Sequence, residues 1–197
     1  MEIKKIEVGQ LKANCYLIVD DAHERVLIID PGDDADYIQR VVSDLDVTPI
    51  ALIATHGHFD HILAVTELKL AYNIPFIMHK KDEFLLQRMQ SSAKHFTGIS
   101  TLPASNVDIP LKKGKTKLGN FEFEVIETPG HTPGSVSLYF KEVDSIFVGD
   151  VMFADGNVGR TDFSYARPLD LNTSIFRIKD LPKGTTIYPG HDDEFVL

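Results

Sequence analysis

Apolar runs bounded by turn residues in the first part of the chain predict strands that alternate with helices. Stretches rich in Val, Ile and Leu end at Gly, Pro, Asn or Asp, as strands commonly do. Residues 34–45 instead place apolar side chains three and four positions apart, which is the spacing of an amphipathic helix. We expect a second helix at 60–72, and strands at 3–8, 14–20, 25–30, 49–55 and 75–79.

The second half of the chain alternates apolar and polar positions, which favours half-buried strands. Between the two halves the pattern is weak: residues 82–90 are predicted to be helical and residues 91–108 to form a loop. Residues 111–119 are predicted to form a solvated hairpin turn. The remaining expected elements are strands at 121–130, 135–140, 145–150 and 184–191, and a last helix within 165–180.

The chain length and the absence of a linker predict one domain. The 197 residues suffice for one well-packed core and are few for two. No low-complexity segment divides them, so we expect a single domain over residues 1–197. Strands that first pair and then alternate with helices, in two rough halves, predict an α/β protein with two sheets and helices outside them.

The charge balance narrows the possible partners. The chain carries a formal charge of −9 and has a sequence pI of about 5.3. Because contacts with phosphates need a basic face, this balance argues against nucleic acid as a partner. No apolar run approaches the length of a membrane span, and the N-terminus lacks the apolar segment of a secretory signal. The one cysteine, Cys15, allows no intrachain disulfide, so we expect a cytoplasmic protein without membrane or nucleic-acid partners.

Three of the eight histidines fall in the stretch THGHFDH, directly after a strand that is apolar on both faces. The stretch therefore lies at the carboxyl end of a buried strand, where open α/β sheets bind ligands. His56 and His58 are two residues apart, so their imidazoles point the same way in an extended chain, and Gly57 leaves room for the backbone to wrap around an ion. The side chains of Asp60 and His61 point in another direction, because these residues stand at the start of the next predicted helix. A single tetrahedral ion would not easily collect all four side chains, whereas two neighbouring ions could.

Three more residues of ligand type follow predicted strands and lie beside glycine: His131, Asp150 and His191. Any one of them alone is more often a turn or capping residue than a ligand. Four such strand ends in one chain are much harder to explain as turns. Nitrogen and oxygen ligands without cysteine suit zinc, and also iron or manganese. The sequence therefore predicts a metal site, with zinc as the first choice.

Other residues that can carry chemistry have simpler explanations. Cys15 lies in a predicted strand and is expected in the core as a small apolar residue. His23 is expected to be exposed in a turn between strands, and His79 to stand at the entry to a helix. His95 could face the site from the middle segment, although nothing in its spacing indicates this.

The series THGHFDH, GHTPGS, GD and GH resembles the motif series of the metallo-β-lactamase superfamily, over nearly the whole chain from Ile3 to His191. The stretches ETPGHTPGSVSLYF, FVGDVMF and GRTDF are most similar to small glyoxalase II-like hydrolases. This resemblance implies a four-layer αββα sandwich with metal ions at the sheet edge. It also implies a single metallo-β-lactamase-like domain, without the C-terminal helical domain of full-length glyoxalase II.

The same resemblance implies a set of ligands divided between two divalent ions, with one aspartate that bridges them. One ion takes His56, His58 and His131, the other takes Asp60, His61 and His191, and Asp150 is the bridge. Arg160 falls where related glyoxalases place a basic residue that contacts the substrate carboxylate. An ion pair with Asp162 is the alternative role for this arginine.

The implied function is hydrolysis of a small-molecule thioester such as S-lactoylglutathione, with a hydroxide shared by the two ions as the nucleophile. Asp60 would orient this nucleophile and accept its proton. Two alternatives stay open. One is a persulfide dioxygenase with a single iron held by His56, His131 and Asp150, which metal content would separate from the hydrolase. The other is a binding protein stabilised by metal, which would have a closed coordination shell.

Overall fold

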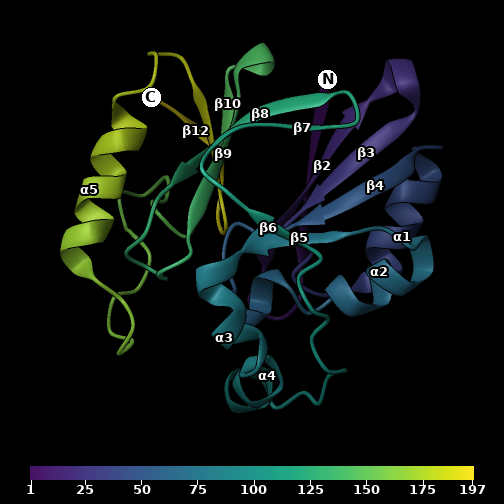
Figure 1. Cartoon of the computed structure of the whole chain (residues 1–197), viewed down its shortest axis with the longest axis horizontal. Helices are drawn as coiled ribbons and strands as arrows, with labels where there is room; N and C mark the ends of the chain where they lie inside the picture. The colour runs from purple at the N-terminus through teal and green to yellow at the C-terminus, as the bar shows by residue number, and fades with distance from the viewer.

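Two six-stranded sheets formed by the described residues lie face to face in the middle of the molecule (Figure 1). The computed structural model describes the backbone of residues 1–197 and every side chain except that of Asp21. The order of elements along the chain follows the two predicted halves, because the first sheet is built from the first half and the second sheet from the second half.

The first sheet has the strand order β1-β2-β3-β4-β5-β6. Its first three strands are antiparallel, and β3 to β6 run parallel to one another. The parallel strands therefore end at one edge of the sheet, at their carboxyl ends. The strands are β1 (Glu2–Val8), β2 (Ala13–Asp20), β3 (Arg25–Ile29), β4 (Thr48–Ile53), β5 (Phe76–His79) and β6 (Ile109–Leu111).

The second sheet has the order β12-β11-β10-β9-β8-β7 and is mostly antiparallel. Its one parallel pair joins β10 and β11, so these two strands also end at the same edge. The strands are β7 (Gly114–Leu118), β8 (Phe121–Glu127), β9 (Val136–Phe140), β10 (Ser145–Gly149), β11 (Thr186–Pro189) and β12 (Phe195–Val196).

Helices cover the outer faces of both sheets (Figure 1). In the figure α1 and α2 lie on the side of the first sheet, α5 lies on the side of the second sheet, and α3 and α4 lie below. The helices are α1 (Ala35–Asp44), α2 (Val65–Tyr72), α3 (Glu83–Leu86), α4 (Met89–Thr97) and α5 (Pro168–Lys179). Short 3-10 turns are η1 (Asp21–His23), η2 (Phe59–His61), η3 (Lys80–Asp82) and η4 (Lys141–Val143).

Apolar side chains fill three layers between these elements. Between the sheets, buried Tyr16 of β2 packs edge-to-face on Phe147 of β10, with ring centroids 5.0 Å apart. The outer face of the first sheet packs on α1 and α2, and the outer face of the second packs on Leu171 and Ile178 of α5. A fully buried aromatic or branched side chain stabilises the fold by about 1.5–3 kcal/mol. The arrangement confirms the expected α/β class and the αββα sandwich.

The expectation of a loop over residues 91–108 is wrong for its first part. Helix α4 continues to Thr97 and ends at Gly98, whose φ of 76° makes it a left-handed C-cap. Serine and threonine lower the helix propensity of this segment. Met89 and Ala93 are nevertheless buried against the first core layer, so tertiary packing stabilises a helix that the local sequence favours only weakly.

Two other expected elements differ from the structure. The helix predicted at 60–72 begins only at Val65, because Ile62 has a φ of −139° that interrupts the helical path after η2. Most of the hairpin turn predicted at 111–119 is the edge strand β7, in which Lys115 and Lys117 are exposed. Exposed lysines suit an edge strand because they oppose pairing with another chain.

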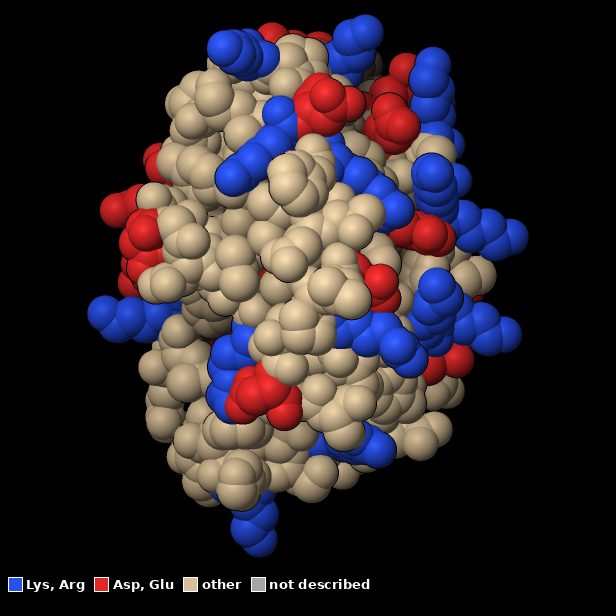
Figure 2. Space-filling view, turned by 90° about the vertical axis from the view of Figure 1, so that its left-hand side faces the viewer, with Lys and Arg blue, Asp and Glu red and all other residues tan. Residues whose placement is uncertain are grey.

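On the side that carries α5, the charged side chains are distributed as on an ordinary globular protein. There, basic and acidic side chains lie next to one another around a central area without charged residues (Figure 2). Among the helices that the structure describes, none has the length and apolar character needed to cross a bilayer.

The junction between the β8–β9 loop and α5 provides a test of the fold. Gly130 has a φ of 138°, and a Cβ at this position would overlap the backbone of Leu171. We expect Gly130→Ala to cost on the order of 3 kcal/mol, since it adds backbone strain and overpacking, and to lower the Tm by roughly 6–12 °C. Gly184→Ala is the matched control, because Gly184 has a φ of 92° with no atom near its Cβ position. Its expected cost is about 1 kcal/mol, and equal losses in calorimetry would contradict the overlap.

Candidate metal centre

The loops that follow five strands of the two sheets meet at one edge of the sandwich. Asp30 follows β3, and His56 and His58 follow β4, in the first sheet. In the second sheet His131 lies in the loop after β8, Asp150 follows β10, and His191 follows β11. The structure thus brings together all seven residues that the sequence indicated as ligands, and adds Asp30. It groups them as His56, His58, His131 and Asp150; as Asp60, His61 and His191; and as Asp30, His56 and His61.

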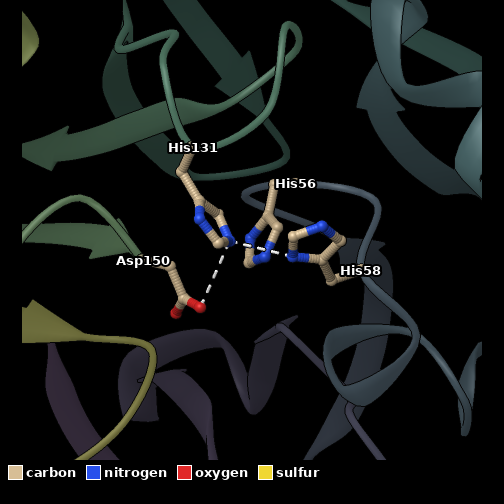
Figure 3. A group of neighbouring side chains, drawn as sticks. All are labelled: His56, His58, His131 and Asp150. Carbon is tan, nitrogen blue, oxygen red and sulfur yellow. Dashed lines mark hydrogen bonds and ion pairs between the residues drawn. The ribbon is translucent and has the colours of Figure 1, made fainter. Parts of the chain in front are cut away.

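Three histidines, His56, His58 and His131, form what we call the first half-site (Figure 3). Nε2 of His131 lies 2.8 Å from Nδ1 of His58 and 3.4 Å from Oδ2 of Asp150. The rings of His56 and His131 are 5.0 Å apart between centroids. The three imidazoles therefore converge from two loops, and the figure shows Asp150 approaching them from the end of β10.

Asp60, His61 and His191 form the second half-site. Oδ2 of Asp60 lies 3.3 Å from Nε2 of His191 and 3.7 Å from Nε2 of His61. Oδ1 of Asp150 lies 3.5 Å from Nε2 of His61 and 3.9 Å from Nε2 of His191. One carboxylate oxygen of Asp150 thus faces the second half-site, while its other oxygen faces the first.

Hydrogen bonds on the outer side of the imidazoles orient their inner nitrogens. Nδ1 of His131 donates to the backbone oxygen of Arg160 at 2.8 Å, so Nε2 is its acceptor nitrogen and faces His58 and Asp150. His58 is turned the other way: its Nε2 lies 2.8 Å from the hydroxyl of Tyr165, so Nδ1 faces the centre. Metal-binding histidines typically have such a partner on the second ring nitrogen, because it fixes the tautomer and the ring orientation.

Asp30 supplies the outer partner for both half-sites. Its carboxylate accepts hydrogen bonds from the backbone N–H and the hydroxyl of Thr55, each at 2.7 Å. The Thr55 hydroxyl oxygen in turn lies 3.1 Å from Nδ1 of His56, and Oδ2 of Asp30 lies 3.2 Å from Nδ1 of His61. One fully buried carboxylate therefore fixes His61 directly and His56 through Thr55.

The inner atoms of this cluster fit a metal ion. Among the described side chains, Nε2 of His56, Nε2 of His61 and Oδ1 of Asp150 are buried and have no hydrogen-bond partner. Leaving a buried polar atom without a partner costs about 1–3 kcal/mol. All three atoms are of a type that binds divalent metals. Ions at the two half-sites would give each of them a partner.

The two half-sites differ in charge. Burial lowers the pKa of His56 well below its usual value, and burial together with His131 lowers the pKa of His58 to about 3. Burial also disfavours the charged form of His61, but Asp150 and Asp60 outweigh it and raise its pKa to about 10. Burial alone would raise the pKa of Asp60, yet His61 and His191 hold that pKa below its usual range. The second half-site therefore favours positive charge, whereas His56 and His58 of the first half-site do not.

A cavity of about 660 Å³ opens over the two half-sites. Apolar side chains form much of its wall, including Phe59 and Phe96, whose rings stack at 5.8 Å, and Phe163 and Tyr165, whose rings stack at 5.3 Å. Its volume lies in the range of about 300–1,000 Å³ that is usual for small-molecule sites.

Two arginines, Arg88 and Arg160, are the basic residues among those that line this cavity. Arg160 makes a two-pronged ion pair with Asp162, at 2.9 and 2.6 Å, and its guanidinium lies 4.8 Å above the ring of Phe163. The alternative role for Arg160 is therefore realised, and its contact with a substrate carboxylate stays a prediction.

Cys15, His23 and His79 lie where the sequence placed them. Cys15 is buried in the core. His23 is exposed and lies 2.8 Å from Asp20, and His79 caps the turn η3 that leads into α3. His95 is exposed on α4 and is absent from the described lining of the cavity.

Sequence reasoning missed three polar residues of this centre. Asp30 ends a strand beside Pro31 and Gly32, which is the same signal that indicated Asp150 and His191. Tyr165 and Asp82 carried no such signal, because each reaches the centre from a segment without a metal-ligand pattern. Their roles depend on tertiary contacts.

Metal addition should stabilise the protein, because it provides partners for the three unpaired atoms and opposite charge for the carboxylates. At a free Zn²⁺ concentration of about 100 times the Kd, the expected gain is about 2.7 kcal/mol, or roughly 5–10 °C in Tm for a chain of this size. Calorimetry of protein prepared without metal, before and after addition of Zn²⁺, measures this gain in Tm. Asp150→Ala should lose most of the gain, whereas the exposed Asp36→Ala should retain it. The same gain in Asp150→Ala as in the unchanged chain would contradict the assignment.

Comparison with known proteins agrees with this geometry. The family model described as the metallo-beta-lactamase superfamily matches residues 8–191. The hydroxyacylglutathione hydrolase GloC of Haemophilus influenzae is 34% identical over 200 residues, which cover 100% of this chain and 89% of that protein.

Two solved structures are similar over nearly their whole length. The B3 metallo-beta-lactamase BLEG-1 has a TM-score of 0.92 and 33% identity, and the match covers 99% of this chain and 94% of that one. TTHA1623 in a di-iron-bound form has a TM-score of 0.90 and 32% identity, with 98% and 94% coverage. The chain therefore belongs to the metallo-β-lactamase superfamily, a family of metallo-hydrolases.

Proposed function

We propose that this chain is a dinuclear metal-dependent hydrolase that cleaves a thioester such as S-lactoylglutathione. The observation that carries the proposal is the position of Asp150, whose two oxygens face different half-sites at 3.4 and 3.5 Å. A carboxylate shared in this way suits a pair of ions about 3.5–4 Å apart. An ion held by histidines alone would not need it.

The residues that would hold the ions are those of the two half-sites. The first ion would take His56, His58 and His131, the second would take Asp60, His61 and His191, and Asp150 would serve both. When bound, such ions supply a water of lowered pKa, near 7 for zinc, and a Lewis acid for the carbonyl group. Nitrogen and oxygen ligands suit zinc, iron and manganese. We propose zinc, and the di-iron form of TTHA1623 makes iron the next candidate.

Asp60 is the residue that we assign to catalysis. It lines the cavity and belongs to the second half-site, so its carboxylate can reach both a bound ion and the substrate. Because His61 and His191 hold its pKa below the usual range, Asp60 stays ionised and accepts a hydrogen bond from the attacking water. Its proposed role is then to orient this water toward the carbonyl carbon and to accept the proton that the water loses.

The cavity supports a small acyl substrate. Its partly aromatic wall offers an apolar surface for the acyl group. The similarity to GloC favours a hydroxyacyl thioester of glutathione. We propose that Arg160, which lines the cavity, binds a substrate carboxylate and shares its guanidinium with Asp162.

A second candidate is hydrolysis of a β-lactam, which the similarity to BLEG-1 favours. Both candidates use the same centre and differ in the bond that is cleaved. Hydrolysis assays with a panel of thioesters and β-lactams therefore distinguish the two candidate functions. A persulfide dioxygenase remains a third outcome, marked by one iron per chain and by consumption of oxygen.

Asp60→Asn should reduce kcat for S-lactoylglutathione hydrolysis by about 10²–10⁴-fold, because the neutral amide neither binds the ion as well nor accepts the proton. His58→Ala should abolish turnover through loss of a ligand. Steady-state assays of the metal-loaded variants measure kcat in both cases, and circular dichroism checks that each variant is folded.

Asp36→Ala is the control for these variants, because Asp36 is an exposed carboxylate of α1 and is not among the described residues that line the cavity. It should keep kcat within about threefold of the unchanged chain, as surface substitutions usually do. Full activity of metal-loaded Asp60→Asn would overturn the mechanism, and activity on β-lactams alone would overturn the thioester substrate.

A further inference from the structure

A buried carboxylate, that of Asp82, lies behind the first half-site. Asp82 is the last residue of η3, and its side chain is fully buried. Oδ2 accepts hydrogen bonds from the backbone N–H of Gly57 at 2.9 Å and from the hydroxyl of Thr132 at 2.6 Å. Oδ1 accepts one from the backbone N–H of Gly134 at 2.6 Å. Asp82 therefore uses both oxygens, and all three donors belong to other parts of the chain.

These donors lie within the two loops that supply the first half-site. Gly57 is the residue between His56 and His58, and Thr132 follows His131 directly. One carboxylate thus joins the backbones of both loops. The described hydrogen bonds of Asp82 include no residue of the second half-site.

Two glycines make this approach possible. A Cβ at Gly134 would lie 2.5 Å from Oδ1 of Asp82, and a Cβ at Gly57 would lie 3.0 Å from the Asp82 Cβ and backbone oxygen. The expectation that Gly57 lets the backbone wrap around an ion stays a prediction. Its small size admits Asp82 and Leu85, on the side of the loop that packs on η3 and α3.

We propose that Asp82 is a positioning residue, which sets the separation of the two loops and thereby the geometry of the first half-site, but not of the second. A carboxylate is needed because both oxygens must accept hydrogen bonds. An asparagine would present an NH₂ group to the backbone N–H of Gly57 or to that of Gly134, and two donors would then face each other. That contact would push one loop away and spread the three imidazoles.

Asp82 also connects the centre to the cavity wall. It begins the segment that continues into α3 and α4, from which Leu85, Arg88 and Phe96 line the cavity. The wall that would contact a substrate and the loops that hold the first half-site therefore share one buried anchor.

The test measures Zn²⁺ affinity, by competition with a chromogenic chelator, in chains that keep one half-site each. His191→Ala disables the second half-site, and His58→Ala disables the first. We expect Asp82→Asn to weaken binding about 10–100-fold in the His191→Ala background, which is the usual effect of losing an outer partner of a metal site. In the His58→Ala background the change should stay below about threefold, within the range expected for independent sites.

Two further variants keep the test decisive. Asp108→Asn is the matched control, because Asp108 also binds a backbone N–H, that of Phe76, but lies away from the centre. It should change neither affinity. If Asp82→Asn fails to fold, Thr132→Val removes only one of the three bonds and should weaken the first half-site alone, by a smaller factor. The Tm of each metal-free variant records its purely structural cost.

The proposal would be overturned if Asp82→Asn lowered the Zn²⁺ affinity of both half-sites equally. It would also be overturned if this variant lowered the Tm and left both affinities unchanged, since Asp82 would then act only as a structural cross-link. The inference rests on the proposed two-metal centre, and the two fail in distinguishable ways. If the unchanged chain binds fewer than two ions, the dinuclear function fails. If it binds two and Asp82→Asn shows no selectivity, only the role of Asp82 fails.

Discussion

The buried imidazole of His61 is surrounded by three aspartate carboxylates, those of Asp30, Asp60 and Asp150. Burying that much negative charge is costly unless it is paired or binds a metal. The arrangement of the centre follows from this constraint. Asp30 is satisfied by Thr55 and His61, whereas Asp60 and Asp150 face the space between the histidines. Cations bound there would neutralise the two carboxylates and hold the loops of both sheets together, so metal binding and the packing of the sheet edges depend on each other.

Most of the fold could be predicted because its signals are local. Strands such as β2 and β4 are buried on both faces and read as apolar runs, and α5 shows helical spacing. The errors lie where tertiary contacts decide the structure. Helix α4 is stabilised by the burial of Met89 and Ala93, and the path after η2 is bent at Ile62 so that Asp60 and His61 can reach the centre. Neither effect is visible in a window of sequence.

The candidate site was predictable to the extent that its residues follow strands. His131, Asp150 and His191 each stand at a strand end beside glycine, and the structure groups them with the THGHFDH stretch. Their assignment as ligands stays a prediction. The outer partners were not predictable in the same way: Asp82 and Tyr165 reach the centre from segments that share no pattern with it. A motif thus gives the inner atoms of such a centre, and the fold supplies the hydrogen bonds that aim them.

Anomalous X-ray diffraction at the zinc absorption edge, on crystals of the zinc-loaded protein, tests the central claim most directly. Two anomalous peaks about 3.5–4 Å apart are expected. One peak should lie among His56, His58 and His131, the other among Asp60, His61 and His191, with a carboxylate oxygen of Asp150 on each. A single peak at the first half-site at saturating metal, with Asp60 and His191 unbound, would contradict it.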